Sequence, residues 1–257
     1  MRTLTIAIAG GTGTLGRHIT EELRSRGHRV RVLSRRSPEH RVDLTTGEGL
    51  ADALEGCDVV VDAVNNPSAK GAARTLVEGS RRLLAAEEAA GVAHHVCVSI
   101  VGCDAAPTGY YRVKTEQERT VRGGPVPWTV VRATQFHELV GTVFGAAGKW
   151  RLLPVPRARL QPIAAADAAR AVADAAEAPA RNGFVQVAGP EITSLRALAG
   201  TWRTVTGRRA LLVPIPVPGA LGRALRAGAL TAERPDARGT VTFGEWLAQR
   251  QGERVHT

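Results

Sequence analysis

A glycine-rich turn between a short apolar run and an amphipathic stretch constrains this chain more than any other feature. Residues 4–9 form the apolar run, and residues 10–16, GGTGTLG, form the turn. A helical pattern then extends over residues 14–26 and stops at Gly27, a residue type that favours helix ends. Strand, glycine turn and helix in this order begin a βαβ unit, so we expect a parallel sheet.

The same alternation continues over the first two thirds of the chain. Strands are predicted at residues 29–33, 42–44, 58–64, 95–100 and 128–132, and helices at residues 48–55, 70–90 and 110–122. The run 58–64, DVVVDAV, is apolar on both faces, which is typical of a buried parallel strand. Right-handed crossovers between such strands predict an α/β fold with a doubly wound parallel sheet.

The pattern changes after Trp150, where prolines become frequent and the predicted elements shorten. Strands are predicted at residues 160–163 and 184–187, and helices at residues 165–177, 195–206 and 217–227. Thr242 and Glu245 form a capping box that predicts the start of a last helix. We therefore expect a sheet domain over residues 1–150 and a smaller C-terminal α/β lobe over residues 151–257, packed beside the strand ends.

Composition excludes several classes of protein. A hydrophobic fraction of 44% and a charged fraction of 23% are those of a globular chain. No run approaches the roughly 18 apolar residues of a membrane span. The first residues are too briefly apolar for a signal peptide, so we expect a cytoplasmic protein. Cys57, Cys97 and Cys103 show no CxxC spacing, and His94 and His95 have no second ligand pair, so neither disulfides nor a metal site is predicted.

The net charge of +10 raises the question of nucleic-acid binding. Of the 34 Lys and Arg residues only Lys70, Lys114 and Lys149 are lysines, and the arginines are scattered through every segment. Scattered charge without interleaved aromatic residues is usually a solvated surface. Nucleic acid is therefore not an expected partner.

The glycine turn predicts a pyrophosphate-binding loop. Glycines allow the backbone to turn tightly and to approach a pyrophosphate without Cβ atoms in the way. The following helix offers its N-terminal N–H groups and a partial positive charge to the anion. A purely structural turn is the alternative, but the position between a strand and a helix favours a cofactor. The residues expected at the cofactor are Gly10, Gly11, Thr12, Gly13, Thr14, Leu15 and Gly16.

The end of the second predicted strand indicates which dinucleotide binds. Proteins that select NAD usually have an Asp or Glu at this strand end, whereas this chain has Ser34, Arg35 and Arg36. A guanidinium group matches a 2′-phosphate that a carboxylate would repel. We therefore expect NADP(H), with Arg35 as the leading contact and Ser34 or Arg36 as the second. The alternative is that Arg35 and Arg36 are simply two of the many arginines of this arginine-rich chain.

Two further residues are candidates for cofactor binding. Asp43 ends the short strand predicted at residues 42–44 and could approach the adenine ring. Asn65 follows the strand predicted at residues 58–64, on the carboxyl-end edge where open sheets bind ligands. Both residue types also favour turns.

A candidate proton donor lies on the helix predicted at residues 110–122. Tyr110 and Lys114 are four residues apart and share one helix face. A neighbouring ammonium lowers a phenol pKa from its ordinary value of about 10. Tyr110 could then protonate a carbonyl oxygen as hydride arrives, Ser99 could hydrogen-bond the same oxygen, and Lys114 could also contact the cofactor ribose. The alternative is a surface helix start with an aromatic pair.

Residues 132–137, RATQFH, follow the last strand of the first domain at the same edge. Polar side chains there, among them Thr134, are expected to face the nicotinamide end of the cofactor. His137 is either a second proton carrier or a helix-start residue, and the sequence favours neither.

Together these residues resemble the short-chain dehydrogenase/reductase superfamily, and within it the atypical NmrA-like and isoflavone-reductase-like branch. The resemblance implies a Rossmann domain, NADP(H), and a substrate cleft roofed by the C-terminal lobe. It is carried by residues 10–16, 33–35, 99–102, 110–114, 132–136, 161–163, Asp167 and 188–191.

Three functions are consistent with these features. The first is an NADP-dependent oxidoreductase acting on a small carbonyl, quinone or enone. The second is a regulatory protein that senses NADP(H) without turnover, and the third is redox-neutral dehydration or isomerisation with the cofactor bound throughout. Aromatic residues make up only 4% of the chain, so a cleft lined by aliphatic groups with Trp150 or Phe136 would favour an apolar or aromatic small molecule. A homodimer is one candidate for the oligomeric state.

Overall fold

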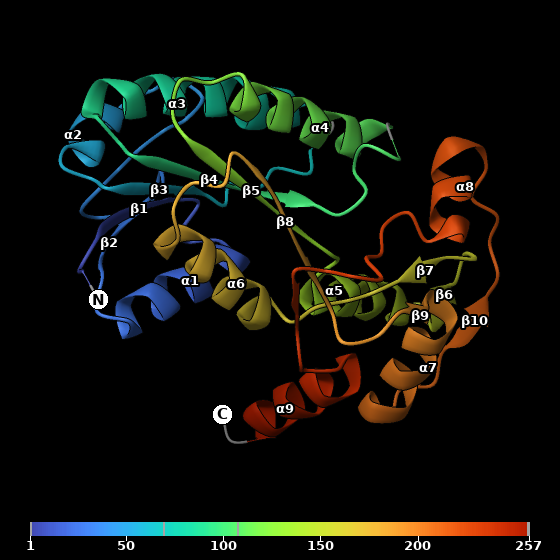
Figure 1. The fold of residues 1–257 in the computed structure, drawn as a ribbon. Helices are drawn as coiled ribbons and strands as arrows, with labels where there is room; N and C mark the ends of the chain where they lie inside the picture. Colours follow the sequence, from blue (N-terminus) through green and yellow to red (C-terminus); the bar gives the residue numbers. More distant parts are fainter. Residues whose placement is uncertain (1, 69, 107, 256–257) are drawn as a thin grey trace. The chain divides into compact units, whose positions relative to one another are not determined.

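The central sheet has seven strands, and it is seen in a computed structural model that describes residues 2–68, 70–106 and 108–255 (Figure 1). In spatial order the strands are β2 (Arg29–Leu33), β1 (Thr5–Ala9), β3 (Val59–Asp62), β4 (His94–Ile100), β5 (Trp128–Ala133), β8 (Gly183–Ala188) and β11 (Ala237–Arg238).

Strand β1 lies between β2 and β3 and pairs with both in parallel, and β3 pairs with β4 in parallel. The chain therefore builds the sheet outward from β1 in two directions, which is the winding of a Rossmann fold. All four residues of β3 are buried, as expected for an inner parallel strand. The predicted doubly wound α/β class is confirmed.

The chain divides into two compact units, each assembled from several stretches. The first unit comprises residues 1–99, 109–132 and 169–185, and the second comprises residues 100–108, 133–168 and 186–257. The sequence predicted a single boundary at residue 150 instead. A doubly wound sheet returns late segments of the chain to early ones, so spatial units need not be continuous in sequence.

Helices lie on both faces of the sheet in the first unit. One face carries α3 (Gly79–Ala90) and α4 (Gly109–Arg122), and the other carries α1 (Thr14–Ser25) and α6 (Ala165–Glu177) from Ala169 on (Figure 1). Arg26, just after α1, donates to the carboxylates of Asp174 at 2.7 Å and Glu177 at 2.6 Å. These ion pairs join the two helices of that face.

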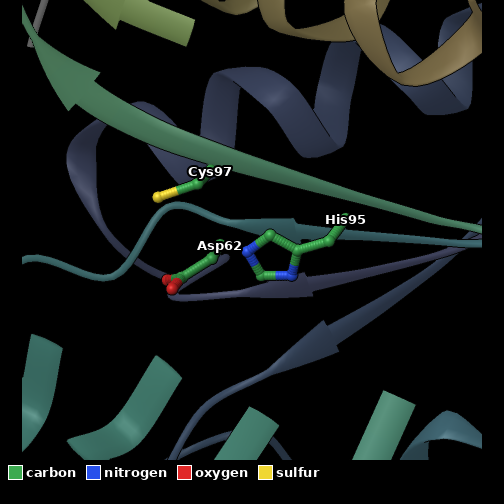
Figure 2. A group of neighbouring side chains, drawn as sticks. All are labelled: Asp62, His95 and Cys97. Atoms are coloured by element: carbon green, nitrogen blue, oxygen red, sulfur yellow. The ribbon is translucent and has the colours of Figure 1, made fainter. Parts of the chain in front are cut away.

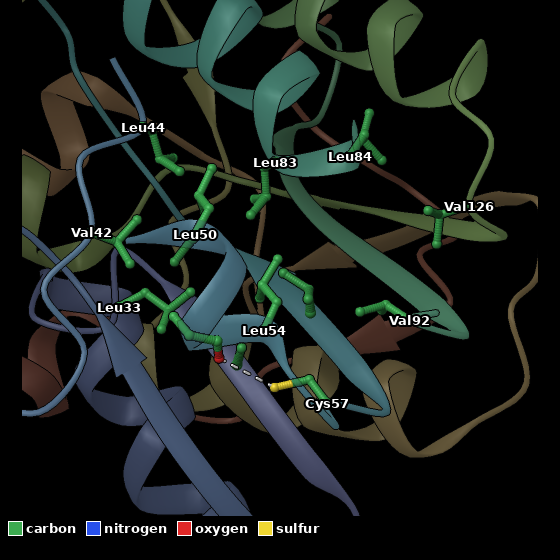
Figure 3. Packing of buried hydrophobic residues seen from close by; sticks show 14 of the residues in the cluster. Leu33, Val42, Leu44, Leu50, Leu54, Cys57, Leu83, Leu84, Val92 and Val126 are labelled. Atoms are coloured by element: carbon green, nitrogen blue, oxygen red, sulfur yellow. Dashed lines mark hydrogen bonds between the residues drawn. The ribbon is translucent and has the colours of Figure 1, made fainter. Parts of the chain in front are cut away.

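The core of the first unit is aliphatic (Figure 3). Leu33, Leu54 and Leu83 are at most 1% exposed within it. The Cys57 thiol lies 3.6 Å from the Ala53 carbonyl oxygen on α2 (Leu50–Leu54). All three cysteines are buried, as expected for cysteines that pack as small apolar side chains.

Two local predictions in this unit were wrong. Residues 42–44 form only isolated bridges, because Asp43 accepts the Gly47 amide at 2.7 Å in a turn instead of continuing a ladder. The helix predicted from residue 70 begins as the π-helical turn η1 (Ala73–Glu78) before α3.

The second unit contains short strands and four helices among its described residues. Its strands pair as β6 (Leu152–Pro154) with β10 (Leu211–Val213), and as β7 (Arg159–Leu160) with β9 (Thr193–Ser194). Its helices are α5 (His137–Gly148), α7 (Leu195–Thr206), α8 (Gly219–Ala227) and α9 (Phe243–Val255). The predicted capping box is confirmed, since Thr242 Oγ1 accepts the Glu245 amide and Glu245 accepts the Thr242 amide.

Aromatic rings fill the core of the second unit. Phe144 packs against Trp202 and Phe243, with ring centroids 6.2 and 6.3 Å apart, and Phe243 stacks on Trp246 at 5.7 Å. Leu153 joins this cluster with no exposed surface. Throughout the described residues, every helix is too short or too polar to cross a bilayer.

Adjacent leucines on β6 provide a matched test of this core. Leu153 is fully buried, whereas its neighbour Leu152 is 49% exposed. We expect Leu153→Ala to lower the free energy of unfolding by about 2–5 kcal/mol, because it leaves a cavity in a packed core. Leu152→Ala should change it by no more than about 0.5 kcal/mol. Urea denaturation followed by tryptophan fluorescence measures both, and equal losses would contradict the packing described.

Candidate active site

The turn GGTGTLG joins β1 to α1, as predicted. Gly10 has a φ of +77°, a left-handed conformation that favours glycine. Its amide donates to the Leu33 carbonyl at 3.1 Å, and its own carbonyl accepts the Gly13 amide at 2.9 Å. The loop is thereby fixed to the carboxyl end of β2.

Backbone contacts explain why the loop needs its glycines. A Cβ on Gly10 would lie 2.9 Å from the Ala63 carbonyl oxygen, just after β3. A Cβ on Gly16 would lie 2.2 Å from the Gly10 carbonyl oxygen, far inside van der Waals contact. The first turn of α1 can therefore pack against the loop only without side chains at these positions.

The N-terminus of α1 suits an anion. Gly13 is the N-cap residue and supplies no side-chain hydrogen bond, and the first turn carries no acidic residue. The N–H groups of a first helical turn have no carbonyl partner within the helix and carry a partial positive charge. Thr12, Gly13 and Thr14 are exposed. The residues present therefore fit the diphosphate of a dinucleotide.

Basic residues follow β2 next to this loop. Ser34 is half-buried and its hydroxyl accepts the Arg36 amide at 3.1 Å, whereas Arg35 and Arg36 are exposed. The Asp43 carboxylate accepts hydrogen bonds from the Thr45 hydroxyl and amide, which, with a smaller contribution from Arg35, lower its pKa below 3.8. Asp43 is therefore an ionised turn residue beside the arginines.

Tyr110 meets Asn65 at the carboxyl edge of the same unit. Asn65 follows β3, two residues beyond Ala63, which contacts Gly10. Tyr110, near the start of α4, donates its hydroxyl to Asn65 Oδ1 at 2.5 Å. The phenol is half-buried and Asn65 is exposed. The structure thus brings together the predicted glycine loop, Asn65 and Tyr110 within one unit.

Lys114 lies in a buried network beneath α4. It is 3% exposed, and its ammonium donates to the Val98 carbonyl at 2.7 Å and to Gln117 Oε1 at 2.5 Å. The Gln117 amide continues to Asp62 Oδ2 at 3.1 Å and to Ser80 at 2.9 Å. The lysine predicted to adjoin the phenol thus makes its described hydrogen bonds inside the protein, near the predicted Ser99, which is 3% exposed on β4.

A second buried cluster, absent from the sequence prediction, adjoins this network (Figure 2). Asp62 from β3 and His95 and Cys97 from β4 point toward one another, with potential ligand atoms within 4.8 Å. They converge because Asp62 pairs with Cys97 across the strands and His95 lies two residues earlier on the same face. Sequence spacing alone cannot show such a cluster.

The charges of this cluster favour an ion pair over a metal. Burial disfavours imidazolium, but Glu87, 2.8 Å from His95 Nδ1, outweighs it and raises the His95 pKa well above 6.5. Burial raises the pKa of the Cys97 thiol above 9.0. A protonated imidazole and a protonated thiol are poor metal ligands. The cluster is a buried Glu87–His95 ion pair next to the Asp62 network.

Two other predicted site residues lie in the second unit. Thr134 is 3% exposed, and its hydroxyl accepts the Gly189 amide at 3.2 Å. His137 is 1% exposed and packs against the rings of Phe243 and Trp246, and its Nε2 lies 2.9 Å from the Val241 carbonyl oxygen. Burial lowers the His137 pKa below 6.5. It is the first residue of α5 and a neutral member of the aromatic core.

A glycine loop with exposed helix-terminal amides, at the carboxyl edge of a doubly wound sheet, defines a dinucleotide-binding protein. A family model described as NAD(P)H-binding matches residues 10–179, and the chain belongs to this family. The resemblance to NmrA-like, atypical short-chain dehydrogenases/reductases is confirmed.

Two relatives that align with most of the chain are named as reductases. A (4-alkanoyl-5-oxo-2,5-dihydrofuran-3-yl)methyl phosphate reductase from Streptomyces griseus is 31% identical over 222 residues, covering 79% of this chain and 74% of that protein. A ceramide reductase from Caulobacter vibrioides is 29% identical over 253 residues, covering 88% and 76%. These relatives identify the chain as an NAD(P)-binding oxidoreductase.

Solved structures share the fold at low identity. An NADPH-dependent quinone oxidoreductase from Escherichia coli, complexed with NADPH, has a TM-score of 0.79 and 19% identity and covers 96% of this chain and 99% of its own. A nucleoside-diphosphate-sugar epimerase from Staphylococcus aureus has the same TM-score and identity and covers 95% and 100%. Such likenesses support the Rossmann architecture.

The contact between Gly16 and Gly10 makes cofactor binding testable. In Gly16→Ala the new methyl group must displace the loop, so we expect NAD(P)H affinity to fall at least about 10-fold, roughly the loss of one hydrogen bond to a charged group. Gly145→Ala on α5 is the control, because its Cβ would meet no atom within 4 Å. Titration by NAD(P)H fluorescence measures both, with circular dichroism to verify folding. An unchanged affinity in Gly16→Ala would exclude the loop as the binding site.

Proposed function

We propose that this protein is an NADPH-dependent reductase of a small carbonyl, quinone or enone compound, with Tyr110 as the proton donor. One observation carries the proposal. Gly10 contacts the segment after β3, and Asn65 of that segment holds the Tyr110 hydroxyl at 2.5 Å. A proton donor and a dinucleotide loop thus share one edge of one unit.

The preference for NADP(H) rests on charge at the end of β2. Leu33 is hydrogen-bonded to Gly10, so the next three residues begin beside the loop. Ser34 offers a hydroxyl, and Arg35 and Arg36 are exposed guanidinium groups. A 2′-phosphate would gain charge-assisted hydrogen bonds there, while NAD(H) finds no acidic residue at that strand end for its ribose hydroxyls.

Bound reduced nicotinamide supplies a hydride to the electrophilic carbon of the substrate. The substrate oxygen gains negative charge as the hydride arrives, and Tyr110 gives it the balancing proton. In the structure that phenolic proton is donated to Asn65, so substrate binding must exchange this hydrogen bond for one to the substrate oxygen. Asn65 thereby keeps the hydroxyl at the sheet edge until the substrate replaces it.

Lys114 and Ser99 act as supporting residues in this proposal. Lys114 ties α4 to β4 through the Val98 carbonyl and so holds the helix that carries Tyr110. Ser99, the next residue on β4, is the candidate for a second hydrogen bond to the substrate oxygen. His137 is less suited to proton transfer, because it is packed against two aromatic rings and only 1% exposed.

The reaction class agrees with the relatives. The Streptomyces griseus protein is named for reduction of an unsaturated oxofuran bearing a methyl phosphate, and the Escherichia coli structure for quinone reduction with NADPH. Both names describe reduction of conjugated oxygen compounds. A conjugated carbonyl compound is therefore the first substrate type to test.

Charge reversal at Arg35 tests the cofactor preference. Arg35→Asp should lower the ratio of NADPH to NADH affinity about 10- to 100-fold, since a charge-assisted hydrogen bond contributes about 1.5–3 kcal/mol. Arg29→Asp, at the opposite end of β2 and also exposed, makes the same change in net charge and should leave the ratio unchanged. Calorimetric titration with both coenzymes gives the ratio, and an unaltered preference in Arg35→Asp would remove the assignment.

Removal of one hydroxyl tests the proton donor. Tyr110→Phe should lower kcat for NADPH-dependent reduction about 10²- to 10⁴-fold while NADPH affinity stays within about threefold, because general acid catalysis contributes that much. Tyr111→Phe is the matched control, being the adjacent tyrosine with ring centroids 6.4 Å apart. Stopped-flow absorbance at the NADPH band measures turnover. Full activity in Tyr110→Phe would require another proton donor.

A further inference from the structure

Four arginines line a pocket in the second unit. The pocket has a volume of about 610 Å³, within the range of small-molecule sites. It is formed by the segment around β7, the start of α7, the end of α8 and the residue after β10. Its lining residues are Val155, Pro156, Arg157, Ala158, Arg159, Ser194, Arg196, Pro214 and Arg226.

Two of the arginines lie in β7 and just before it. Arg157 and Arg159 are exposed and alternate with the buried Ala158 and Leu160. Arg159 pairs with Ser194 across the β7–β9 ladder. Both arginines line the pocket, while the buried Ala158 and Leu160 anchor the segment in the core.

The other two arginines of the pocket lie at helix termini. Ser194 is the N-cap of α7 and accepts the Ala197 amide at 3.1 Å, so Arg196 lies in the first turn of that helix. Arg226 lies in the last turn of α8, which packs against β7. Since α7 has twelve residues, its N-terminus also contributes a partial positive charge to this wall of the pocket.

The described residues that line the pocket bring no carboxylate near these charges. The lining contains no Asp or Glu, and within the described residues neither Arg157, Arg159 nor Arg196 forms an ion pair. Arg226 makes one long hydrogen bond, 3.4 Å to the Val217 carbonyl. Arg132 of the first unit, in contrast, pairs with Glu118 at 2.6 Å. Like charges gathered without counter-charge favour binding of an anion.

We propose that this pocket binds the phosphate group of a phosphorylated small molecule. Guanidinium groups bind phosphate oxygens in pairs, and helix N-terminal amides favour the same charge. Val155, Pro156 and Pro214 provide apolar walls for an organic remainder. That the bound molecule is the substrate of the reductase rests on the proposed function; the phosphate site itself rests on the pocket alone.

Phenyl phosphate is a suitable probe, because it joins a phosphomonoester to an apolar ring. It is titrated by calorimetry into the full chain saturated with NADPH, so that the glycine loop is filled. We expect binding that weakens as salt is raised. Phenol should show no heat, and inorganic phosphate should bind more weakly than phenyl phosphate because it forgoes the apolar walls.

Arginine variants locate the binding. Arg157→Gln/Arg159→Gln, and separately Arg196→Gln, should weaken phenyl phosphate at least 10-fold. The control Arg203→Gln/Arg223→Gln removes two exposed arginines of α7 and α8 outside the lining and should change affinity less than twofold. Equal losses in pocket and control variants would overturn the site, as would no binding by the parent. If inorganic phosphate binds as tightly as phenyl phosphate, the proposal that the ligand carries an organic group is wrong.

Turnover separates this inference from the proposed function. If the protein reduces conjugated carbonyl compounds with NADPH, and the pocket variants raise KM only for phosphorylated substrates, both the reductase function and the phosphate site are supported. Turnover with unchanged KM in the pocket variants overturns the phosphate site as a substrate site and leaves the reductase intact. Phenyl phosphate binding that depends on the arginines, in a protein that does not oxidise NADPH with any substrate, refutes the reductase and leaves the phosphate site.

Discussion

The close backbone packing of the glycine loop is the constraint on which the first unit depends. Gly10 lies against the segment after β3, Gly11 against Val32 of β2, and Gly16 against Gly10 itself. Three neighbouring strand ends and the first turn of α1 thus share one small volume from which side chains are excluded. The same exclusion leaves helix-terminal amides facing outward, so the steric requirement of the fold and the electrostatic requirement of a diphosphate are met by one set of residues.

A network of buried polar and charged side chains holds the sheet face that carries α3 and α4. Asp62 at the end of β3 is linked through Ser80 and Gln117 to Lys114, and Lys114 to the β4 backbone. Each such group is costly to bury unless every partner is present, so the network fixes α3 and α4 in one register on the sheet. The position of Tyr110 follows from this, because it lies one turn before Lys114 on the same helix. Lys114 therefore holds the helix that carries Tyr110 in place on the sheet.

The sequence predicted the elements whose signals are local. The glycine turn, α6, α7 and the capping box at Thr242 all depend on residues near one another in the chain. Contacts that depend on pairing across the sheet were missed, among them the Asp62, His95 and Cys97 cluster and the inward direction of Lys114. Helix α5 was predicted only as a start at His137, because its glycines and β-branched residues weaken the helical pattern that packing against Trp202 and Trp246 restores. Tyr110 and Asn65 were both candidates, but their hydrogen bond joins residues 45 apart and no spacing rule connects them.

The arginines of the chain show why composition alone could not assign its charge. Arg26 and Arg132 form ion pairs with carboxylates. Arg26 thereby joins α1 to α6, and Arg132 joins β5 to α4. Arg35 and the pocket arginines form no ion pair in the described residues: Arg35 lies at the end of β2 beside the glycine loop, and Arg196 lies at the start of α7. The net charge of +10 therefore includes arginines in different surroundings, some paired with carboxylates inside the protein and others exposed at the proposed anion sites. At the proposed sites the arginines lie in small groups, four of them around one pocket, and such a group suits the phosphate of a small molecule.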